Sequence, residues 1–417
     1  MLTLKDCSMP LCSKKILPGL LSILLFCSWS FSPSVSWANK KTVKLGFIAD
    51  ITGPGFLISL AQKNALDLGV EEINSSGGLL GRKTEILVRD SQMKPELGAA
   101  LARDLIYKDK VDFLFGPTSP AVALAVSLVA KEHKKLICFH AANSERLTTE
   151  QGHRYLFQVT PNTFMKGQAV ATFLTKKGFK KIALIGPDTD NAHGQAMAFK
   201  KKLAEINPGA QVVKELWPKL GEQDYASYIT ALSAGKPEII YTLLWSGDLA
   251  GFFRQSRAAG LFHKGPTMIG LLDYDLLKGL GADLLANLYG FDWAPFYAIN
   301  TPQIKAFIEK YRLRTGEYPS AWAITVYDGL LALRKAVEKA KTVDTEKVIE
   351  ALEGLQWDSL RGPQMIRSQD HQANGGLYFG ITYKDPKYSF LTMKNLLYIP
   401  GQEVWHTPEE LKTFRRY

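Results

Sequence analysis

Hydrophobic and polar positions follow a repeated order along the chain. Each unit has a short apolar run, a turn rich in glycine or proline, and a segment with the 3.6-residue period of a helix. Because the apolar runs are continuous instead of alternating, they predict strands buried on both faces, as in a parallel sheet covered by helices. The first series places strands at 43–50, 84–90, 111–116 and 135–140.

Two helix starts in this first series carry recognisable signals. Ser59 and Gln62 have the spacing of a capping box, so a helix is expected to open at Ser59. Pro95 marks the first turn of the next helix, which follows the strand at 84–90. Helix and strand therefore alternate from the beginning of the folded chain.

A second series begins after Pro161 and repeats the same order. Helices are expected from Phe164, His193, Tyr225 and Asp248, with strands at 181–186, near 212, at 238–244 and near 268. Further helices are expected at 301–315, 320–341 and 344–354, and short strands from Gln364 onward. The predicted fold class is α/β, with two doubly wound Rossmann-like sheets in tandem.

The first 38 residues have the layout of a secretory signal. Lys14 and Lys15 precede an apolar core, and Ser36 and Ala38 are small residues before a cleavage point near Asn39. A membrane anchor is disfavoured, because the apolar core is shorter than about 18 residues. Lipidation at Cys27 is disfavoured because bulky Phe26 precedes it. Export as a soluble protein is predicted.

Composition excludes several classes of function. Three of the four cysteines lie in the signal, so Cys138 remains alone, which leaves no internal disulfide or cysteine zinc site and predicts a buried, inert thiol. The formal net charge is +11, but the lysines are scattered and form no arginine-rich stripe, which disfavours nucleic-acid binding.

Motifs for catalysis are not seen. The chain has no G-x-S-x-G elbow and no phosphate-binding loop, and Gly53-Pro-Gly55 lacks the third glycine of a dinucleotide fingerprint. The seven histidines have no paired metal-ligand spacing, and four of them are expected at the surface: His133, His153, His263 and His406. No catalytic residue, metal or cofactor is predicted, and the chain is not expected to be an enzyme.

The turn that follows the strand at 111–116 is the most informative local feature. In FGPTSPAVALAV, Ser119 stands before Pro120, which is the arrangement of an N-cap followed by proline at the first helical position. Structural capping alone explains such a pair. A helix N-terminus also presents free N–H groups, so Thr118, Ser119 and the N–H groups of Ala121 and Val122 are an alternative anion-binding site.

Several longer segments resemble the periplasmic leucine/isoleucine/valine-binding protein family, the substrate-binding proteins of ABC transporters. The resemblance covers essentially the whole chain after the signal. It rests on VKLGFIADITGPG, LDLGVEEINSSGGLLGRK, FGPTSPAVALAV, ICFHAANSERLT, FRQSRAAGL, YRLRTGEYPSAWAITVYDGLLAL and RGPQMIRSQDHQANGGLYFG.

The resemblance implies a type I periplasmic binding fold, with two lobes joined by three crossing segments. The crossings are expected near Thr160-Pro161, Asp292-Trp293 and Ile366-Arg367. Lobe one would then comprise 39–160 plus 293–366, and lobe two would comprise 161–292 plus 367–417.

The resemblance also implies a ligand site between the lobes. Ser119, with Thr118 beside it, matches the hydroxyl that receives a ligand carboxylate, and Ala141 and Asn143 match the next loop. The loop from Phe56 to Ile58 would supply an apolar wall, and Trp245 stands at an aromatic position of the family. His193 stands where the family usually has an aromatic residue, and Asp273 would pair with a ligand ammonium. Trp245 as a core aromatic and Asp273 as the N-cap of the next helix are the structural alternatives.

The function implied by the resemblance is the periplasmic component of an ABC importer. The expected ligand is a small amino acid, branched-chain or otherwise hydrophobic; the alternatives are an amide, a urea-like compound or an aromatic acid, or a role as an exported ligand sensor. The expected partner is an inner-membrane ABC permease, and the protein is expected to be a monomer that binds no nucleic acid.

Overall fold

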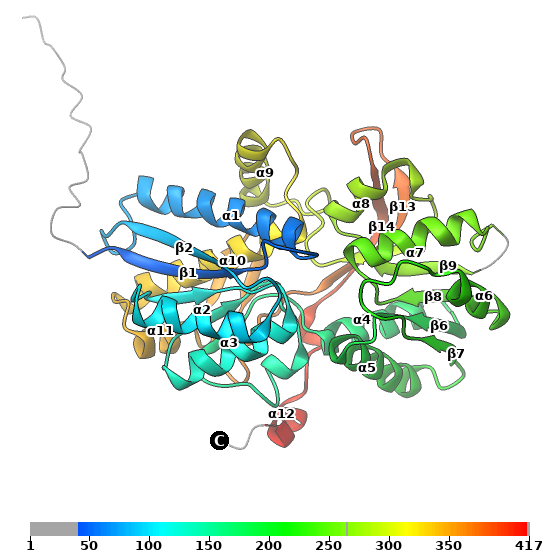
Figure 1. Ribbon diagram of the computed structural model, residues 1–417, viewed down its shortest axis with the longest axis horizontal. Helices are drawn as coiled ribbons and strands as arrows, with labels where there is room; N and C mark the ends of the chain where they lie inside the picture. The colour runs from blue at the N-terminus through cyan, green and yellow to red at the C-terminus, as the bar shows by residue number, and fades with distance from the viewer. Residues whose placement is uncertain (1–40, 264–265, 415–417) are drawn as a thin grey trace, which may run out of the picture. The chain divides into compact units, whose positions relative to one another are not determined.

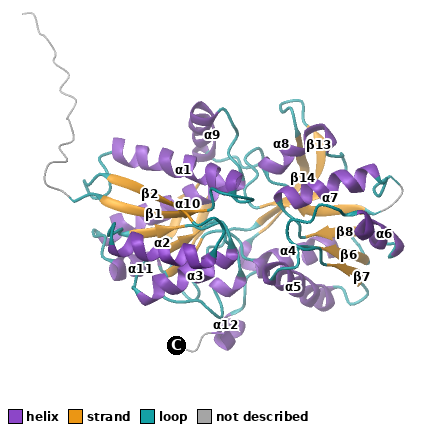
Figure 2. Ribbon diagram, viewed as in Figure 1, coloured by secondary structure: helices purple, strands orange, loops and turns teal. Residues whose placement is uncertain are grey.

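The computed structural model of the protein describes residues 41–263 and 266–414. The predicted signal at 1–38 lies outside the described residues. Helices and parallel strands alternate through most of the chain (Figures 1 and 2), as the hydrophobic pattern predicts. The described residues contain no helix that combines the length and apolarity needed to cross a bilayer.

The first sheet is entirely parallel, in the order β2-β1-β3-β4-β5. Its strands are β1 (Val43–Ala49), β2 (Thr84–Asp90), β3 (Phe113–Phe115), β4 (Ile137–Phe139) and β5 (Leu156–Gln158). The associated helices are α1 (Phe56–Ser75), α2 (Pro95–Tyr107), α3 (Pro120–Glu132), α9 (Pro302–Thr315), α10 (Ala321–Ala340) and α11 (Thr345–Leu352).

Neighbouring residues of β1 show why its sequence is continuously apolar. Phe47 belongs to the core cluster that contains α1 and α10, whereas Ile48 belongs to the separate cluster formed with α2 and α3. Both side chains are fully buried. The strand is therefore covered on both faces, which removes any advantage of alternating polar residues.

The second sheet has the order β14-β13-β10-β9-β8-β6-β7. Its parallel strands are β6 (Lys181–Ile185), β7 (Gln211–Leu216), β8 (Ile239–Thr242), β9 (Thr267–Leu271) and β10 (Tyr289–Asp292), and β13 (Leu377–Lys384) and β14 (Leu391–Ile399) run antiparallel at one edge. The remaining elements are α4 (Thr163–Lys176), α5 (Asp190–Ile206), α6 (Ala226–Ala234), α7 (Ser246–Ala258), α8 (Tyr274–Leu280), the hairpin β11 (Gln356–Ser359) and β12 (Gly362–Met365), and α12 (Pro408–Phe414).

The chain leaves the first sheet after β5, returns toward it after β10, and enters the second sheet again after β12. A buried ion pair lies close to these passages. Arg361 Nε contacts Asp328 Oδ2 at 2.7 Å, and an Arg361 Nη2–H donates to the Val159 carbonyl at 3.1 Å. The exact boundaries of the two lobes stay a prediction.

Several predicted element starts were wrong by a few residues. Helix α1 begins at Phe56, before the expected capping box, and the Ser59 hydroxyl accepts the Asp50 N–H at 2.9 Å from within the helix. Helix α5 begins at Asp190 with Thr189 as its N-cap, so His193 lies inside its first turn. The Ser59 bond comes from Asp50, outside the helix, which a local pattern does not report, whereas Thr189 is an ordinary N-cap that accepts the N–H of Ala192.

Some features escaped the sequence pattern altogether. The strand β5 and the final helix α12 were not predicted. Helix α12 has seven residues, about two turns, which is too short to show a clear helical period. His153 and His406, expected at the surface, are buried. The His406 ring stacks on Phe164 with ring centroids 3.6 Å apart and contacts Glu145 at 2.9 Å, so tertiary partners make its burial favourable.

Candidate functional site

A cavity of about 320 Å³ is lined by residues of both sheet systems, near the carboxyl ends of the strands. Ligand pockets in proteins are roughly 300–1,000 Å³, so this volume suits a small solute. The residues that line it are Ile58, Met93, Thr118, Ser119, Pro120, Ala121, Leu124, Ala141, Asn143, Lys166, Pro187, Thr189, Asp190, Asn191, Ala192, Gln195, Leu220, Thr242, Leu243, Leu244, Trp245, Leu271, Phe291, Trp293 and Trp322.

The turn before α3 is held by a buried carboxylate. Asp50 Oδ2 accepts the backbone N–H of Thr118 at 3.0 Å and that of Ser119 at 2.7 Å, and Ser91 donates its hydroxyl to Asp50 Oδ1. Gly116 allows this close approach, since its φ is +88° and a Cβ there would lie 2.0 Å from the Ile48 carbonyl oxygen. The negative charge of Asp50 therefore already complements the start of α3.

The two hydroxyls of this turn differ in their partners. Thr118 Oγ1 donates to Gln62 Oε1 at 3.3 Å and lies 3.3 Å from Ser59 Oγ. Ser119 occupies the N-cap position, as predicted, but its side chain makes no capping hydrogen bond. Among the described residues, the Ser119 hydroxyl has no hydrogen-bond partner, so its hydrogen-bonding capacity is available to a molecule in the cavity.

Helix α4 contributes a lysine that the sequence analysis missed. Lys166 is buried, donates from Nζ to Asn143 Oδ1 at 3.0 Å, and lies 5.7 Å from the centre of a Trp293 ring. Asn191 Nδ2 donates to the same Asn143 oxygen at 3.3 Å. Gln195, one turn further along α5, also lines the cavity and donates to the Tyr241 hydroxyl at 2.5 Å.

The ammonium of Lys166 has no carboxylate partner among the described residues. Burial lowers the pKa of Lys166 to about 7. Among the described residues that line the cavity, the only acidic side chain is that of Asp190, which is 93% exposed and lies 3.5 Å from Arg146. A buried cation without a counter-ion is costly, so the cavity favours an anionic ligand.

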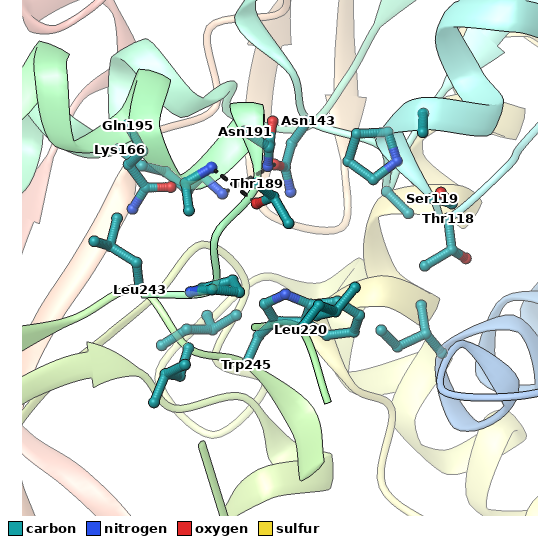
Figure 3. A pocket seen from close by; sticks show the side chains of 18 of the residues that line it. Thr118, Ser119, Asn143, Lys166, Thr189, Asn191, Gln195, Leu220, Leu243 and Trp245 are labelled. Atoms are coloured by element: carbon teal, nitrogen blue, oxygen red, sulfur yellow. Dashed lines mark hydrogen bonds between the residues drawn. The ribbon is translucent and has the colours of Figure 1, made fainter. Parts of the chain in front are cut away.

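Figure 3 shows the cavity with Lys166 and Gln195 on one side and Ser119 and Thr118 on the other. We call the group Lys166, Asn143, Asn191 and Gln195 the lysine end, and the group Thr118, Ser119 and Ala121 the α3 end. The walls between them are mostly apolar, with large contributions from Trp245, Trp293, Trp322 and the leucines 220 and 243. Such walls fit a ligand with an apolar body.

Asp273, expected to pair with a ligand ammonium, does not line this cavity. Its carboxylate is used within the protein: Oδ1 accepts the Leu276 N–H at 2.9 Å as the N-cap of α8, and Oδ2 accepts the Trp322 indole N–H at 2.7 Å. Burial raises the pKa of Asp273. Asp273 therefore holds Trp322 in the cavity wall and lies beside a neighbouring hollow of about 220 Å³.

Two more predicted positions lie off the cavity. The His193 ring packs on Trp217 with centroids 3.9 Å apart, and its Nε2 lies 2.8 Å from Asp188 Oδ1. Phe56 is 43% exposed at the start of α1, although Ile58 in the same helical turn does line the cavity. The cavity thus brings together five of the predicted residues, which are Thr118, Ser119, Ala141, Asn143 and Trp245.

Lys166 was missed because no motif marks it. It stands between Met165 and Gly167 in a helix whose neighbouring residues are almost all buried. A lysine in such a surrounding is the one available signal, since lysine is rarely buried without a partner. No group of three or more potential metal ligands occurs in the parts of the chain that are described.

The chain belongs to the periplasmic binding protein family, whose model matches residues 42–382. This family consists of solute-binding proteins of ABC transporters, so the class predicted from the sequence is confirmed. The family implies a periplasmic location, a small-molecule ligand and a partnership with a permease.

Individual proteins agree with this assignment. A Leu/Ile/Val-binding protein homolog 6 from Brucella abortus (strain 2308) is 26% identical over 361 residues, which is 84% of this chain and 89% of the relative. A crystal structure of an ABC-type branched-chain amino acid transporter from Rhodopseudomonas palustris CGA009 has a TM-score of 0.73 at 25% identity, covering 88% of this chain and 99% of that one.

The solved structures also include a solute-binding protein of an ABC transporter from Rhodopseudomonas palustris HaA2 in complex with p-hydroxybenzoic acid. Its TM-score is 0.80 at 23% identity, and the match covers 88% of this chain and all of that one. The predicted type I periplasmic binding fold, with two lobes, is confirmed.

Proposed function

We propose that this protein binds a small organic acid with an apolar or aromatic body and delivers it to an ABC permease. The observation that carries the proposal is Lys166, a buried cation in the cavity with no carboxylate partner among the described residues. A ligand carboxylate would supply the missing negative charge and accept the ammonium N–H groups not used by Asn143.

The charges of the site favour a simple carboxylate over an amino acid. An amino acid brings an ammonium group, which needs a carboxylate or several acceptors when it is buried. Asp273 is used by Leu276 and Trp322, and Asp190 is exposed. The amino-acid ligand expected from the family resemblance therefore has no assigned ammonium partner in this cavity.

The apolar walls support the same choice. Trp245, Trp293 and Trp322 line the cavity together with leucines, and flat aromatic side chains suit an aromatic or branched body. The protein from Rhodopseudomonas palustris HaA2, which shares the fold, was solved with p-hydroxybenzoic acid. Benzoate is therefore the simplest probe of this proposal.

The rest of the assignment follows the family. We propose a monomer without catalytic activity, exported by the signal at 1–38, with lobe one at 39–160 plus 293–366 and lobe two at 161–292 plus 367–417. A ligand that touches both lobes would favour their closed arrangement, which a permease could then recognise.

Isothermal titration calorimetry with benzoate, benzamide and leucine tests the ligand class. The purified protein is first unfolded and refolded to remove any solute carried through purification. We expect benzoate to bind at least about tenfold more tightly than benzamide, because hydrogen bonds to charged groups contribute about 1.5–3 kcal/mol. If leucine binds more tightly than benzoate, the proposal is wrong and an amino-acid ligand replaces it.

A further inference from the structure

The two ends of the cavity differ in charge. The lysine end carries a cation without a carboxylate partner among the described residues. That cation donates to the Asn143 amide oxygen, which also accepts from Asn191 Nδ2. The α3 end carries no cation. Its turn is held by Asp50, whose carboxylate is buried and accepts the N–H groups of Thr118 and Ser119.

Asp50 changes what the α3 end is able to bind. An anion placed at Ser119 would lie next to a second carboxylate held within 3.0 Å of the same backbone turn. Like charges brought together in a buried site repel strongly. The positive end of the α3 dipole, which makes helix starts attractive to anions, is already complemented by Asp50.

The hydroxyl of Ser119 remains able to hydrogen-bond. It makes no capping bond and has no partner among the described residues. Ser119 lies in the cavity wall, and only 6% of the residue is exposed. The N–H groups of Ala121 and Val122 lie in the first turn of α3, where helical N–H groups have no acceptor within the helix. The Ser119 hydroxyl and these two N–H groups can therefore hydrogen-bond to an uncharged oxygen of a ligand.

We propose that the ligand lies across the cavity with its carboxylate at the lysine end and an uncharged hydrogen-bonding group, such as a hydroxyl, at the α3 end. Ser119 is then a specificity residue, because its hydroxyl favours an acid that carries a hydroxyl group. The nearby carboxylate of Asp50 disfavours an acid with a second carboxylate at this end. The orientation is the reverse of the carboxylate placement at Ser119 expected from the family resemblance. This inference rests on the proposed function, because it needs the carboxylate at Lys166.

The test compares three acids that differ at one position: benzoate, 4-hydroxybenzoate and terephthalate. Titration calorimetry should show 4-hydroxybenzoate binding about three- to tenfold more tightly than benzoate, which is the range for one neutral hydrogen bond. Terephthalate, with its second carboxylate, should bind at least about tenfold more weakly than 4-hydroxybenzoate.

Variants of Ser119 assign the preference to its hydroxyl. In Ser119→Ala the ratio of 4-hydroxybenzoate to benzoate affinity should fall to near one, and in Ser119→Thr, which keeps a hydroxyl, the preference should return. Ser227→Ala is the matched control, because Ser227 is exposed on α6 and does not line the cavity. Far-ultraviolet circular dichroism and thermal unfolding show whether each variant is folded.

The outcomes separate this inference from the proposed function. If benzoate does not bind, both fail. If benzoate binds but terephthalate binds as tightly as 4-hydroxybenzoate, the proposed function stands and the charge argument at the α3 end is wrong. If Ser119→Ala weakens both monoacids equally and leaves their ratio unchanged, the carboxylate lies at Ser119 and the orientation is overturned.

Discussion

Replacing Lys166 by methionine should make the ligand-free protein more stable and a poorer binder. Methionine has a similar length and no charge, so it fills the same volume beside Trp293 without a buried ammonium. Lys166 is expected to lower the stability of the ligand-free protein while it improves ligand binding, because function and stability often conflict in a ligand site.

The structure sets the size of the effect. Burial lowers the pKa of Lys166 from 10.5 to about 7, which corresponds to roughly 4–5 kcal/mol at about 1.36 kcal/mol per pKa unit. Methionine also loses the hydrogen bond to Asn143, about 1 kcal/mol, and the contact with the Trp293 ring, about 1 kcal/mol. The net gain in unfolding free energy is therefore about 2–3 kcal/mol at pH 7.

The gain in unfolding free energy of Lys166→Met should decrease as the pH rises above about 7. Since the folded-state pKa of Lys166 lies below the unfolded value, the unfolded chain binds more protons between about pH 7 and pH 10.5. The cost of burying Lys166 is complete below about pH 7 and is relieved as the pH rises toward 10.5. The difference in stability between variant and wild type should shrink over that range.

Urea unfolding of the refolded, ligand-free proteins measures the stability change, and titration calorimetry measures benzoate binding. Benzoate affinity of Lys166→Met should fall by about 10- to 100-fold, because one charge-assisted hydrogen bond is lost. Lys176→Met is the matched control, since Lys176 is exposed at the end of the same helix. A Lys166→Met protein that is less stable than wild type, or that binds benzoate as before, would refute the reasoning.

Three further predictions concern the charged groups of the molecule. Benzoate affinity of the wild type should stay level below about pH 7 and fall by up to about tenfold per pH unit above it, because the complex needs a protonated Lys166; calorimetry in buffers of different ionisation enthalpy should show proton uptake. Asp273→Ala should cost about 2–4 kcal/mol in urea unfolding and change tryptophan fluorescence, since it removes an N-cap and the partner of Trp322; Asp273→Asn should lose less. Asp328→Ala should cost about 3–5 kcal/mol by the same assay, because Arg361 would remain buried without its partner, and a loss below about 1 kcal/mol would contradict that view.

The architecture was predictable because its signals are local. Continuous apolar runs identified β1, β2 and most other strands, and Pro95 and Pro120 marked the starts of α2 and α3 within a residue. Buried parallel strands and helix starts depend on a few adjacent residues, so a single sequence is sufficient to place them. The start of α1 was misplaced because Ser59 bonds to Asp50 from within the helix, and the start of α5 was misplaced because Thr189 is its N-cap in place of a residue next to His193.

The site was only partly predictable. The loops after β3 and β4, which the sequence analysis singled out, both line the cavity, because the carboxyl ends of parallel strands meet at one edge of a sheet. The roles of Asp273 and Lys166 in the site could not be predicted from the sequence. Their surroundings come from elements far apart in the sequence, and neither residue stands in a motif that reports those surroundings.

The sequence by itself therefore determined the fold class, the family and the position of Ser119 at the start of a helix, since these follow from periodicity and neighbouring residues. Only the tertiary structure decided the charge of the site. It brought Asp50 under the α3 turn, directed Asp273 to Trp322, and buried Lys166 in the cavity with no carboxylate partner in the described parts of the chain. The energy of a charge depends on its distance to every other charge and on its exclusion from water, and both are fixed only when the chain is folded.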